Sequence, residues 1–320
     1  MSNDPIRWGL LGTSRINHKL MAGAAGTDDA EIVAVGSRSA SAGEAFAMAH
    51  DIPKAHASYE SLLADPGVDA IYIPLPNSMH HPWTLKALAA GKHVLCEKPY
   101  TRRPQEVEVA WDAAEAAGLV LMEGFMWRHT PQADRIVELL PSIGELIAVR
   151  ATFSFPLEDD ADIRLDDALD GGSLMDVGTY CISAARLLAG EEPDVVYGRQ
   201  VTTAQGVDRR FAGLMHFPSG VTASFHSGFD AFTESLELIG RGGTISLPDP
   251  WHSTQGRFFV DGREERVEPI NPYQCELEDM AAAIRGEKAQ RLGRDDAMGQ
   301  ARTIEALYAS ADSGAPVSLT

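Results

Sequence analysis

The chain has 320 residues, 44% of them hydrophobic and 23% charged, which is typical of a globular protein of two domains. A net charge of −19 argues against a nucleic-acid partner, because neutralising phosphates requires a basic surface. Three widely spaced cysteines fit neither a disulfide framework nor a zinc site, and we find no signal peptide and no apolar run of membrane-spanning length. We therefore expect a soluble cytoplasmic protein without a metal site.

The first part of the chain alternates strand and helix patterns. The predicted strands are residues 6–11, 31–35, 69–73, 93–96 and 119–122. The predicted helices are residues 15–25, 40–50, 59–64, 82–90 and 104–117. This alternation predicts a parallel sheet wrapped by helices on both faces, that is, a doubly wound α/β (Rossmann) domain over residues 1–126.

The pattern changes in the rest of the chain, residues 127–320. Helices are predicted at residues 131–140, 174–189, 273–285 and 294–313. A strand at 146–153, an acidic loop at 157–170 and alternating apolar residues over 194–267 complete the pattern. Alternation with frequent turns predicts a large, mostly antiparallel sheet, so we expect a second, α+β domain here.

The turn after the first strand is a degraded phosphate-binding fingerprint, residues 12–17 (GTSRIN). Gly12 fits the G-x-G-x-x-G pattern, whereas Ser14 and Asn17 replace the second and third glycines. Small residues there let backbone N–H groups approach a pyrophosphate at a helix N-terminus. An ordinary strand–turn–helix corner is the alternative. The predicted cofactor contacts in this turn are Gly12, Thr13, Ser14, Arg15 and Ile16.

The end of the second strand indicates which dinucleotide binds. An acidic residue there usually holds a free ribose 2′-hydroxyl, but this chain has Ser37 and Arg38. A guanidinium pairs with a 2′-phosphate, which a carboxylate would repel. The sequence therefore predicts NADP(H), unless Arg38 is only a solvated turn residue.

Lys98 follows the strand at 93–96, within Glu97-Lys98-Pro99. Ligands of parallel sheets bind at the carboxyl ends of the strands, so Lys98 beside a bound cofactor would hydrogen-bond a substrate oxygen or carry a proton. A surface lysine paired with Glu97 is the alternative.

A second catalytic candidate lies in residues 171–180 (GGSLMDVGTY). Asp176 and Tyr180 are four residues apart and would share one face of a helix starting at residue 174. Tyr180 would act as a general acid or base, and Asp176 would bind substrate hydroxyls. A buried tyrosine that serves only packing is the alternative.

Loops after two further strands add predicted cofactor contacts. Leu75, Asn77 and His80 follow the strand at 69–73, and Asn77 is equally suited to be a helix N-cap. His80 and its neighbour are adjacent in sequence and so do not form a metal pair. Trp127 and Arg128 would line the mouth of the cleft.

Together these segments resemble the Gfo/Idh/MocA oxidoreductases. The resemblance is carried by residues 8–17 (WGLLGTSRIN), 97–99 (EKP), 125–128 (FMWR) and 171–180. It extends over essentially the whole chain and is greatest to the branch of NADP-dependent D-xylose dehydrogenases and dimeric dihydrodiol dehydrogenases.

The resemblance implies a Rossmann domain followed by a domain whose sheet often forms the subunit interface. It implies that Lys98 is the catalytic lysine, that Tyr180 occupies the position of a histidine in many relatives, and that Asp176 is a substrate-site aspartate. It also implies an active-site role for Arg164. Ser14 and Asn17 depart from the family's glycines, which affects the details of the pyrophosphate contacts.

We accordingly expect NADP(H)-dependent oxidation of a cyclic aldose at C1 to a lactone, in a homodimer or homotetramer. Tyr180 would take the hydroxyl proton, assisted by Lys98, while Asp176, Arg164 and Trp127 bind the sugar. A ketosugar reductase or trans-dihydrodiol dehydrogenase is the alternative of the same class. A non-catalytic NADP(H)-binding regulator is the alternative of another class.

Overall fold

The computed structural model describes residues 4–319, and their contacts divide the chain into two compact units. The first unit comprises the chain up to Thr101, Gln105–His129 and Asn271–Ala297. The second comprises Arg102–Pro104, Thr130–Ile270 and the chain from Met298 onward. Each unit is described by itself below.

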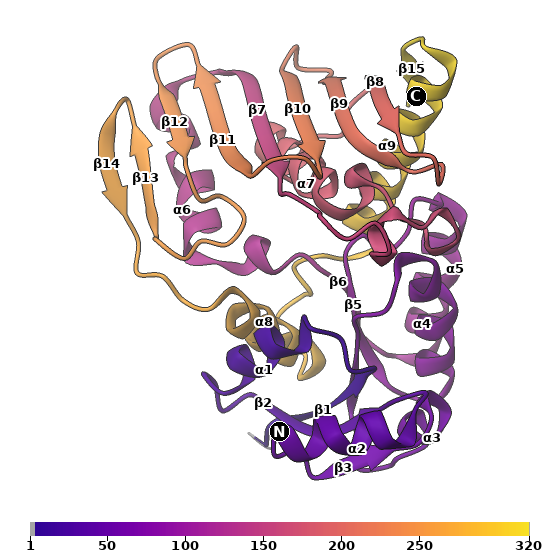
Figure 1. Ribbon diagram of the computed structural model, residues 1–320. Helices are drawn as coiled ribbons and strands as arrows, with labels where there is room; N and C mark the ends of the chain where they lie inside the picture. Colours follow the sequence, from indigo (N-terminus) through magenta and orange to yellow (C-terminus); the bar gives the residue numbers. More distant parts are fainter. Residues whose placement is uncertain (1–3, 320) are drawn as a thin grey trace. The chain divides into compact units, whose positions relative to one another are not determined.

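The first unit is built on a six-stranded sheet in the order β3-β2-β1-β4-β5-β6, in which every neighbouring pair is parallel (Figure 1). Its strands are β1 Ile6–Leu11, β2 Ala30–Gly36, β3 Lys54–His56, β4 Ala70–Ile73, β5 His93–Glu97 and β6 Leu121–Gly124. The central strands are short apolar runs that are almost wholly buried, as expected for a sheet with both faces covered. The chain order reverses between β1 and β4, the position where such sheets bind their ligands.

Six of the described helices lie wholly or mostly in the same unit as this sheet. They are α1 Asn17–Ala24, α2 Ala40–Ala49, α3 Tyr59–Leu63, α4 His80–Ala89, α5 Pro104–Ala117 and α8 Pro272–Ile284. The helix α8 comes from the C-terminal part of the chain and packs on α1. Their contact is close because of Gly23, where a Cβ atom would lie 2.6 Å from the backbone of Gln274.

The second unit contains a nine-stranded sheet in the order β14-β13-β12-β11-β7-β10-β9-β8-β15. Its strands are β7 Leu146–Ser154, β8 Val195–Thr202, β9 Asp208–His216, β10 Thr222–Gly228, β11 Thr233–Gly240, β12 Thr244–Leu247, β13 Arg257–Val260, β14 Arg263–Arg266 and β15 Val317–Ser318. Only β7 and β10 pair in parallel among the described strands of this sheet.

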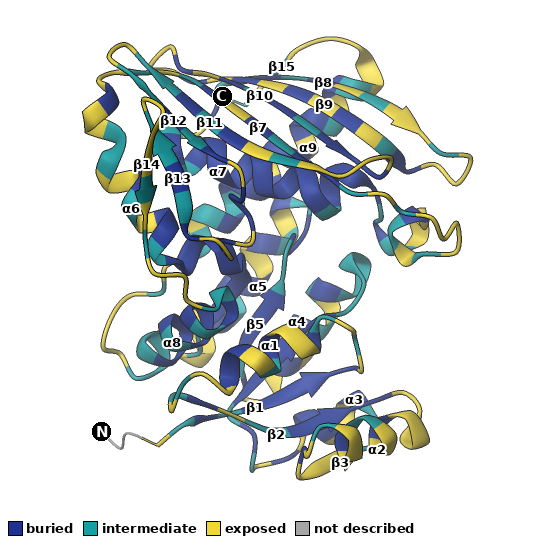
Figure 2. Cartoon of the chain, turned by 60° about the vertical axis from the view of Figure 1, so that its left-hand side comes forward, coloured by how far each residue is buried: buried dark blue, intermediate teal, exposed yellow. Residues whose placement is uncertain are grey.

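One face of this sheet is buried and the other is open. The helix α7 (Thr179–Ala189) packs on β7 and β10, and Figure 2 shows buried residues alternating with exposed ones along the strands. Strand β9 alternates almost perfectly, which is the pattern of a sheet with one covered face. Helices α6 (Pro131–Leu139) and α9 (Arg294–Ser313) complete the described helices of eight or more residues.

The architecture confirms the predicted fold class, and three local predictions are corrected. Strand β3 was not predicted, because a three-residue edge strand with exposed residues carries almost no apolar signal. The first helix begins at Asn17, not at residue 15. The helix predicted from residue 174 opens with a π-helical turn, Leu174–Gly178, and is α-helical only from Thr179.

The contacts also place Asn271–Ala297 with the first unit, so the units are not consecutive along the chain. The division into domains 1–126 and 127–320 follows chain order and stays a prediction. Among the described residues, no helix combines the length and the apolar character needed to cross a membrane.

Candidate active site

The turn after β1 is closed by its own backbone and by Asn17. Gly12 has a φ of +107°, which favours glycine, and its N–H donates to the carbonyl of Gly36 over 2.8 Å. The buried amide of Asn17 donates to the carbonyl of Gly12 over 2.8 Å. The first N–H groups of α1, those of Asn17, His18 and Lys19, donate to the carbonyls of Ser14, Arg15 and Ile16, so the turn runs directly into the helix. Asn17 therefore has a structural role that the glycine pattern did not reveal.

Tyr59 links this turn to the end of β2. Its hydroxyl lies 3.3 Å from the position that a Cβ atom on Gly12 would take, and the charge of Arg38 acts on it. Burial raises the pKa of Tyr59, and the nearby guanidinium partly offsets that rise. Arg38 is exposed, whereas Ser37 is buried and its Oγ accepts a hydrogen bond from the N–H of Ser39 over 3.2 Å. Sequence analysis missed Tyr59, because its position at a helix start carries no motif.

His80 joins the loops that follow β4 and β5. One ring nitrogen lies 2.8 Å from the carbonyl oxygen of Leu75 and the other lies 2.9 Å from that of Pro99. Burial lowers the pKa of His80, so the ring is neutral and donates to one carbonyl at a time. With 1% of its surface exposed, His80 holds the two loops together, and a direct contact of His80 with the cofactor stays a prediction.

Glu97, which immediately precedes Lys98, accepts a hydrogen bond of 2.5 Å from the hydroxyl of Tyr72 on β4. A second carboxyl group, Glu276 on α8, is wholly buried, and neither of its oxygens has a hydrogen-bond partner among the described residues. Burial, and then the neighbouring Glu97, raise the pKa of Glu276 well above its usual range. Its surroundings therefore favour the neutral carboxyl form of Glu276, and no sequence pattern had singled it out.

Trp127 and Arg128 lie in a buried 3-10 turn, η2 (Met126–His129), that is fixed by Asp279 of α8. Asp279 accepts a 2.6 Å hydrogen bond from His129 and pairs with Lys288 and, over 3.0 Å, with Arg291. Burial opposes the charge on Asp279, but the donors and cations lower its pKa below the usual range. Burial also lowers the pKa of His129, so the net positive charge comes from the lysine and the arginine.

In the second unit, the glycine pair at 171–172 packs against the turn that carries Arg164. A Cβ atom on Gly171 would lie 2.4 Å from the carbonyl oxygen of Arg164, and the N–H of Gly172 donates to that oxygen over 2.8 Å. Gly172 has a φ of +115°. The glycines are needed for this close approach of two loops as well as for the sharp turn predicted from the sequence.

Arg164 is thereby held against Asp176. Its Nε donates to Asp176 Oδ2 over 2.8 Å, and its Nη1 donates to Asp162 over 3.2 Å. The charge of Asp176, followed by that of Asp162, raises the pKa of Arg164. The guanidinium and the Asp176 carboxylate form a polar pair that could bind vicinal hydroxyl groups, one as donor and the other as acceptor.

Asp208 fixes the π-helical turn that contains Asp176. One carboxyl oxygen accepts hydrogen bonds of 2.7 Å from Ser173 Oγ and from the N–H of Leu174, and the other accepts one of 2.7 Å from the hydroxyl of Tyr308. All these donors are neutral, and burial raises the pKa of Asp208. Because the first turn is π-helical, the four-residue spacing of Asp176 and Tyr180 does not have the α-helical geometry that we expected.

Tyr180 belongs to an aromatic cluster. Its ring centroid lies 5.3 Å from that of Phe153 on β7 and 5.9 Å from that of Trp251. Trp251 is fixed in turn by a 3.0 Å hydrogen bond from its Nε1 to the carbonyl of Thr152. Tyr180 is only 7% exposed, so its orientation is set by packing.

Each unit thus gathers its own candidate residues. In the first unit they follow the carboxyl ends of the neighbouring strands β1, β2, β4 and β5, where a parallel sheet binds its ligand. In the second unit Arg164 and Asp176 are in contact, and Tyr180 follows on the same helical segment.

Comparisons with known proteins agree with this division. Residues 6–125 match the Gfo/Idh/MocA oxidoreductase family with an NAD-binding Rossmann fold, and residues 141–246 match the C-terminal domain of the same family. D-xylose 1-dehydrogenase (NADP(+)) 2 from Haloferax volcanii is 40% identical over 98% of this chain and 100% of its own length. Trans-1,2-dihydrobenzene-1,2-diol dehydrogenase from Xenopus laevis is 31% identical over 83% of each chain.

Solved structures give the same result. Aldose-aldose oxidoreductase from Caulobacter crescentus, complexed with glycerol, has a TM-score of 0.90 and 28% identity over 98% of this chain and 99% of its own. KijD10, a 3-ketoreductase from Actinomadura kijaniata in complex with NADP and TDP-benzene, has a TM-score of 0.90 and 28% identity over 96% and 98%. This chain therefore belongs to the Gfo/Idh/MocA family of oxidoreductases.

Proposed function

We propose that this protein is an NADP(H)-dependent sugar oxidoreductase that oxidises a cyclic aldose at C1 to the lactone. The observation that carries the proposal is the combination of an NADP-type turn, Ser37 and Arg38, with the Lys98, Asp176 and Tyr180 set. It is supported by the xylose dehydrogenase that is 40% identical over 98% of this chain and 100% of its own length.

The first unit fits the cofactor. The positive φ of Gly12 and the turn that leads into α1 suit a pyrophosphate, with contacts from Thr13, Ser14, Arg15 and Ile16. The exposed guanidinium of Arg38 suits a 2′-phosphate. The remaining proposed contacts are Leu75, Asn77, Glu97, Lys98, Trp127 and Arg128, with His80 as a brace.

The proposed chemistry divides between the two units. The bound nicotinamide supplies the hydride acceptor. Tyr180, in its phenolate form, would take the proton of the anomeric hydroxyl as the hydride leaves C1 for the cofactor, and the ammonium of Lys98 would stabilise the negative charge on the reacting oxygen. Asp176 and Arg164 bind the sugar hydroxyls, and Trp127 bounds the site.

The test of catalysis is NADPH formation with aldoses, polyols and dihydrodiols, using NADP⁺ and NAD⁺ in parallel. Lys98→Met should reduce turnover about 10²–10⁴-fold, as expected for a proton-transfer group. Lys86→Met is the matched control, because Lys86 lies exposed on α4, over the ring of Trp83 and paired with Glu60, and has no proposed role in the site. A loss below about tenfold for Lys98→Met would refute the assignment.

Cofactor choice has its own test. Arg38→Gln should weaken the binding of NADP⁺ much more than the binding of NAD⁺, because it removes the ion pair between the guanidinium and the 2′-phosphate. If both cofactors respond equally, the end of β2 does not select between them.

A reductase of ketosugars is the second candidate. It is supported by dTDP-3,4-didehydro-2,6-dideoxy-alpha-D-glucose 3-reductase from Streptomyces violaceoruber, 35% identical over 90% of this chain. Oxidation of NADPH by keto sugars in the absence of aldose turnover would favour it. NADPH binding without turnover of any substrate would favour a non-catalytic regulator.

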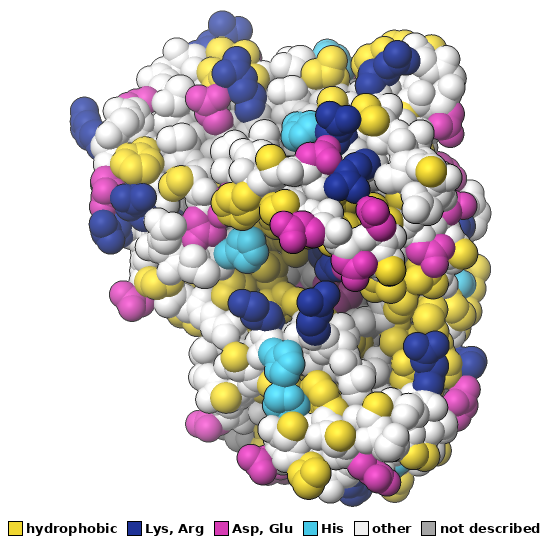
Figure 3. Space-filling view, in the orientation of Figure 1, with side chains coloured by type: hydrophobic (Ala, Val, Ile, Leu, Met, Phe, Trp, Pro, Cys, Tyr) yellow, Lys and Arg dark blue, Asp and Glu magenta, His cyan; other side chains and the backbone are white. Residues whose placement is uncertain are grey.

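We further propose a cytosolic homo-oligomer that assembles through the open face of the nine-stranded sheet. On this face Leu214 of β9 and Val201 of β8 are 54% and 49% exposed, and an interface would bury them. All three cysteines are free and buried, as in reducing compartments. Lysine and arginine are interspersed with acidic side chains on the face seen in Figure 3, which supports a small-molecule ligand and not nucleic acid. Light scattering of Leu214→Glu should show dissociated subunits.

A further inference from the structure

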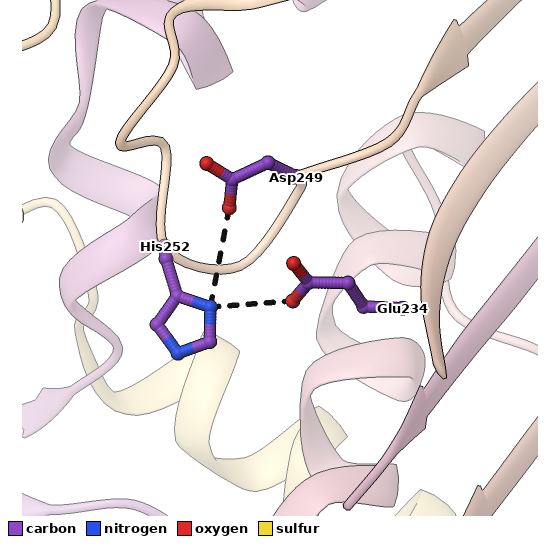
Figure 4. A group of neighbouring side chains, drawn as sticks. All are labelled: Glu234, Asp249 and His252. Carbon is purple, nitrogen blue, oxygen red and sulfur yellow. Dashed lines mark hydrogen bonds and ion pairs between the residues drawn. The ribbon is translucent and has the colours of Figure 1, made fainter. Parts of the chain in front are cut away.

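Three side chains of the second unit converge on one point outside the residues discussed so far. Glu234 lies on β11, and Asp249 and His252 lie in the loop after β12 (Figure 4). His252 Nδ1 is 3.2 Å from Glu234 Oε2 and 3.9 Å from Asp249 Oδ1. Figure 4 shows that both carboxylates point at the same ring nitrogen.

The carboxylate of Asp249 is held rigidly in this position. Its Oδ2 accepts hydrogen bonds from Thr254 N, Thr254 Oγ1 and Gln255 N at 2.8, 2.6 and 3.2 Å. Gln132 donates to the carbonyl oxygen of Asp249 over 3.0 Å and to Ser253 Oγ over 3.1 Å. The loop is therefore fixed independently of His252.

The other oxygen of Asp249 has no such partner. Asp249 is 3% exposed, and its Oδ1 is buried and receives no hydrogen bond from the described residues. A buried carboxylate oxygen without a donor is costly, so an oxygen fixed in this state and aimed at two other ligand atoms points to a bound cation.

The histidine alone cannot neutralise and hydrogen-bond both carboxylates of the cluster. Two carboxylates face one imidazole, whose Nδ1 carries at most one proton to donate. The pair of His216 with Asp194 in the same unit shows the simple case, one ring nitrogen and one carboxylate 2.7 Å apart.

We propose that Glu234, Asp249 and His252 bind one divalent transition-metal ion of the zinc and manganese class. An imidazole with two carboxylates suits these ions, whereas Ca²⁺ and Mg²⁺ prefer oxygen ligands alone. The ligand atoms all lie within 4.8 Å of one another. Tetrahedral zinc with ligands at about 2.0–2.1 Å needs spacings of about 3.4 Å, so small side-chain movements close the site.

The exposure of the site and its number of ligands both suit such an ion. The side chain of His252 is 46% exposed, which provides an entry path, and three protein ligands leave room for water. The site departs from the sequence expectation of no metal, because ligands 15 and 3 residues apart match no metal-binding motif.

The ion would stabilise the loop that packs on Tyr180. The ring of His252 lies 5.8 Å from Phe153, which stacks on Trp251 at 5.9 Å, and both of these rings contact Tyr180. We assign the ion a positioning role for this aromatic cluster, since the three ligands themselves are separated from Tyr180 by these rings.

The test is calorimetric titration of the chelator-treated full-length protein with ZnCl₂ and with MnCl₂ at neutral pH, together with elemental analysis after dialysis. We expect one ion per chain. His252→Ala and Asp249→Asn should each weaken binding at least tenfold, on the scale found for disrupted metal sites. His252 is largely exposed, so its replacement leaves the fold intact.

His216→Ala is the matched control, because it removes an equally exposed histidine that pairs with a single carboxylate. It should bind the ion as the wild type does. No saturable binding of either ion in several-fold excess over protein would overturn the proposal. So would binding that survives both His252→Ala and Asp249→Asn, since the ion would then lie elsewhere.

Discussion

Two buried aspartates anchor the candidate residues, one in each unit, and their surroundings are opposite. Asp279 of the first unit holds the turn with Trp127 and Arg128, and it is surrounded by His129, Lys288 and Arg291. Asp208 of the second unit holds the π-helical turn with Asp176, and its donors are Ser173, Leu174 and Tyr308. The pKa is lowered for Asp279 and raised for Asp208.

The difference shows that burial alone does not fix the charge of an anchoring carboxyl group. Burial opposes ionisation at both sites. Cationic neighbours overcome it at Asp279, whereas neutral hydroxyl and amide donors do not at Asp208. The first unit therefore uses an anchor paired with cations, and the second uses one held only by neutral hydrogen-bond donors.

The largest effect on stability is expected for Asp279→Asn. The substitution removes the charge that balances Lys288 and Arg291, and we expect a loss of about 3 kcal/mol in the free energy of unfolding, at the lower end for buried pairs because both cations are part-exposed. Urea unfolding near pH 7 measures it. Asp112→Asn, which breaks an exposed pair with Arg294, is the control and should change stability little. Equal effects of the two substitutions would contradict the ionic anchor.

The next largest loss of stability is expected for Gly172→Ala. It combines a φ of +115° with a Cβ atom placed 2.2 Å from Asp208 Oδ1, so we expect a loss of about 2–3 kcal/mol. Gly190→Ala is the control, because Gly190 also has a positive φ but open space around its Cβ, and about 1–2 kcal/mol is expected there. Thermal unfolding compares the two, and equal losses would mean that the approach to Asp208 is unimportant.

Asp208→Asn should cost less, about 1–2 kcal/mol near pH 7, because the asparagine keeps one acceptor and removes a carboxyl group whose charge is disfavoured. Its pH dependence should also be opposite to that of Asp279→Asn. The lowered pKa of Asp279 gives stability that is present above the unfolded pKa of about 3.9 and is lost as the pH falls through the folded value.

The raised pKa of Asp208 has the opposite sign, so its carboxyl group stabilises the fold most at low pH and loses that effect as the pH rises. The deficit of Asp279→Asn should therefore grow as the pH rises from 3 to 6, and that of Asp208→Asn should shrink. Unfolding curves at a series of pH values measure both slopes. If the stability deficits of both variants changed with pH in the same direction, the proposed difference between Asp279 and Asp208 would be wrong.

The smallest change is expected for Glu276→Gln. The carboxyl group of Glu276 resembles that of Asp208 in having a raised pKa, but it lacks hydrogen-bond donors among the described residues. Replacement by the neutral amide should change stability by no more than about 1 kcal/mol near pH 7, and should stabilise the fold at higher pH, where the wild-type carboxyl group must ionise or stay protonated at a cost. A loss of several kcal/mol in urea unfolding would show that the glutamate charge is needed.

The parallel sheet was predictable because its signals are local. Apolar runs of four to six residues separated by helix-length segments place β1, β4 and β5, and the residues after each strand end must gather at one edge. For the same reason Gly12, Ser37, Arg38 and Lys98 could be named from the sequence as candidates. The edge strand β3 was missed because it is held by pairing with β2 and not by burial.

The anchors of these candidates could not be predicted. Asp279 contacts a turn 150 positions earlier in the chain, and Asp208 contacts residues 34 and 35 positions away and another 100 away. Tyr59 and Glu276 likewise owe their environment to segments distant in sequence. A spacing rule finds residues on one element, whereas these groups are defined by which elements pack together.

The sequence by itself determined the class of the two folds, the family, and the residue types available at the strand ends, because periodicity, turn residues and short motifs are properties of neighbouring positions. Only the tertiary structure decided the π-helical start of the segment with Tyr180, the contact of Arg164 with Asp176, and the charge states of Asp208, Asp279 and Glu276. Those features depend on burial and on the charge of distant neighbours, and both arise only when the chain has folded.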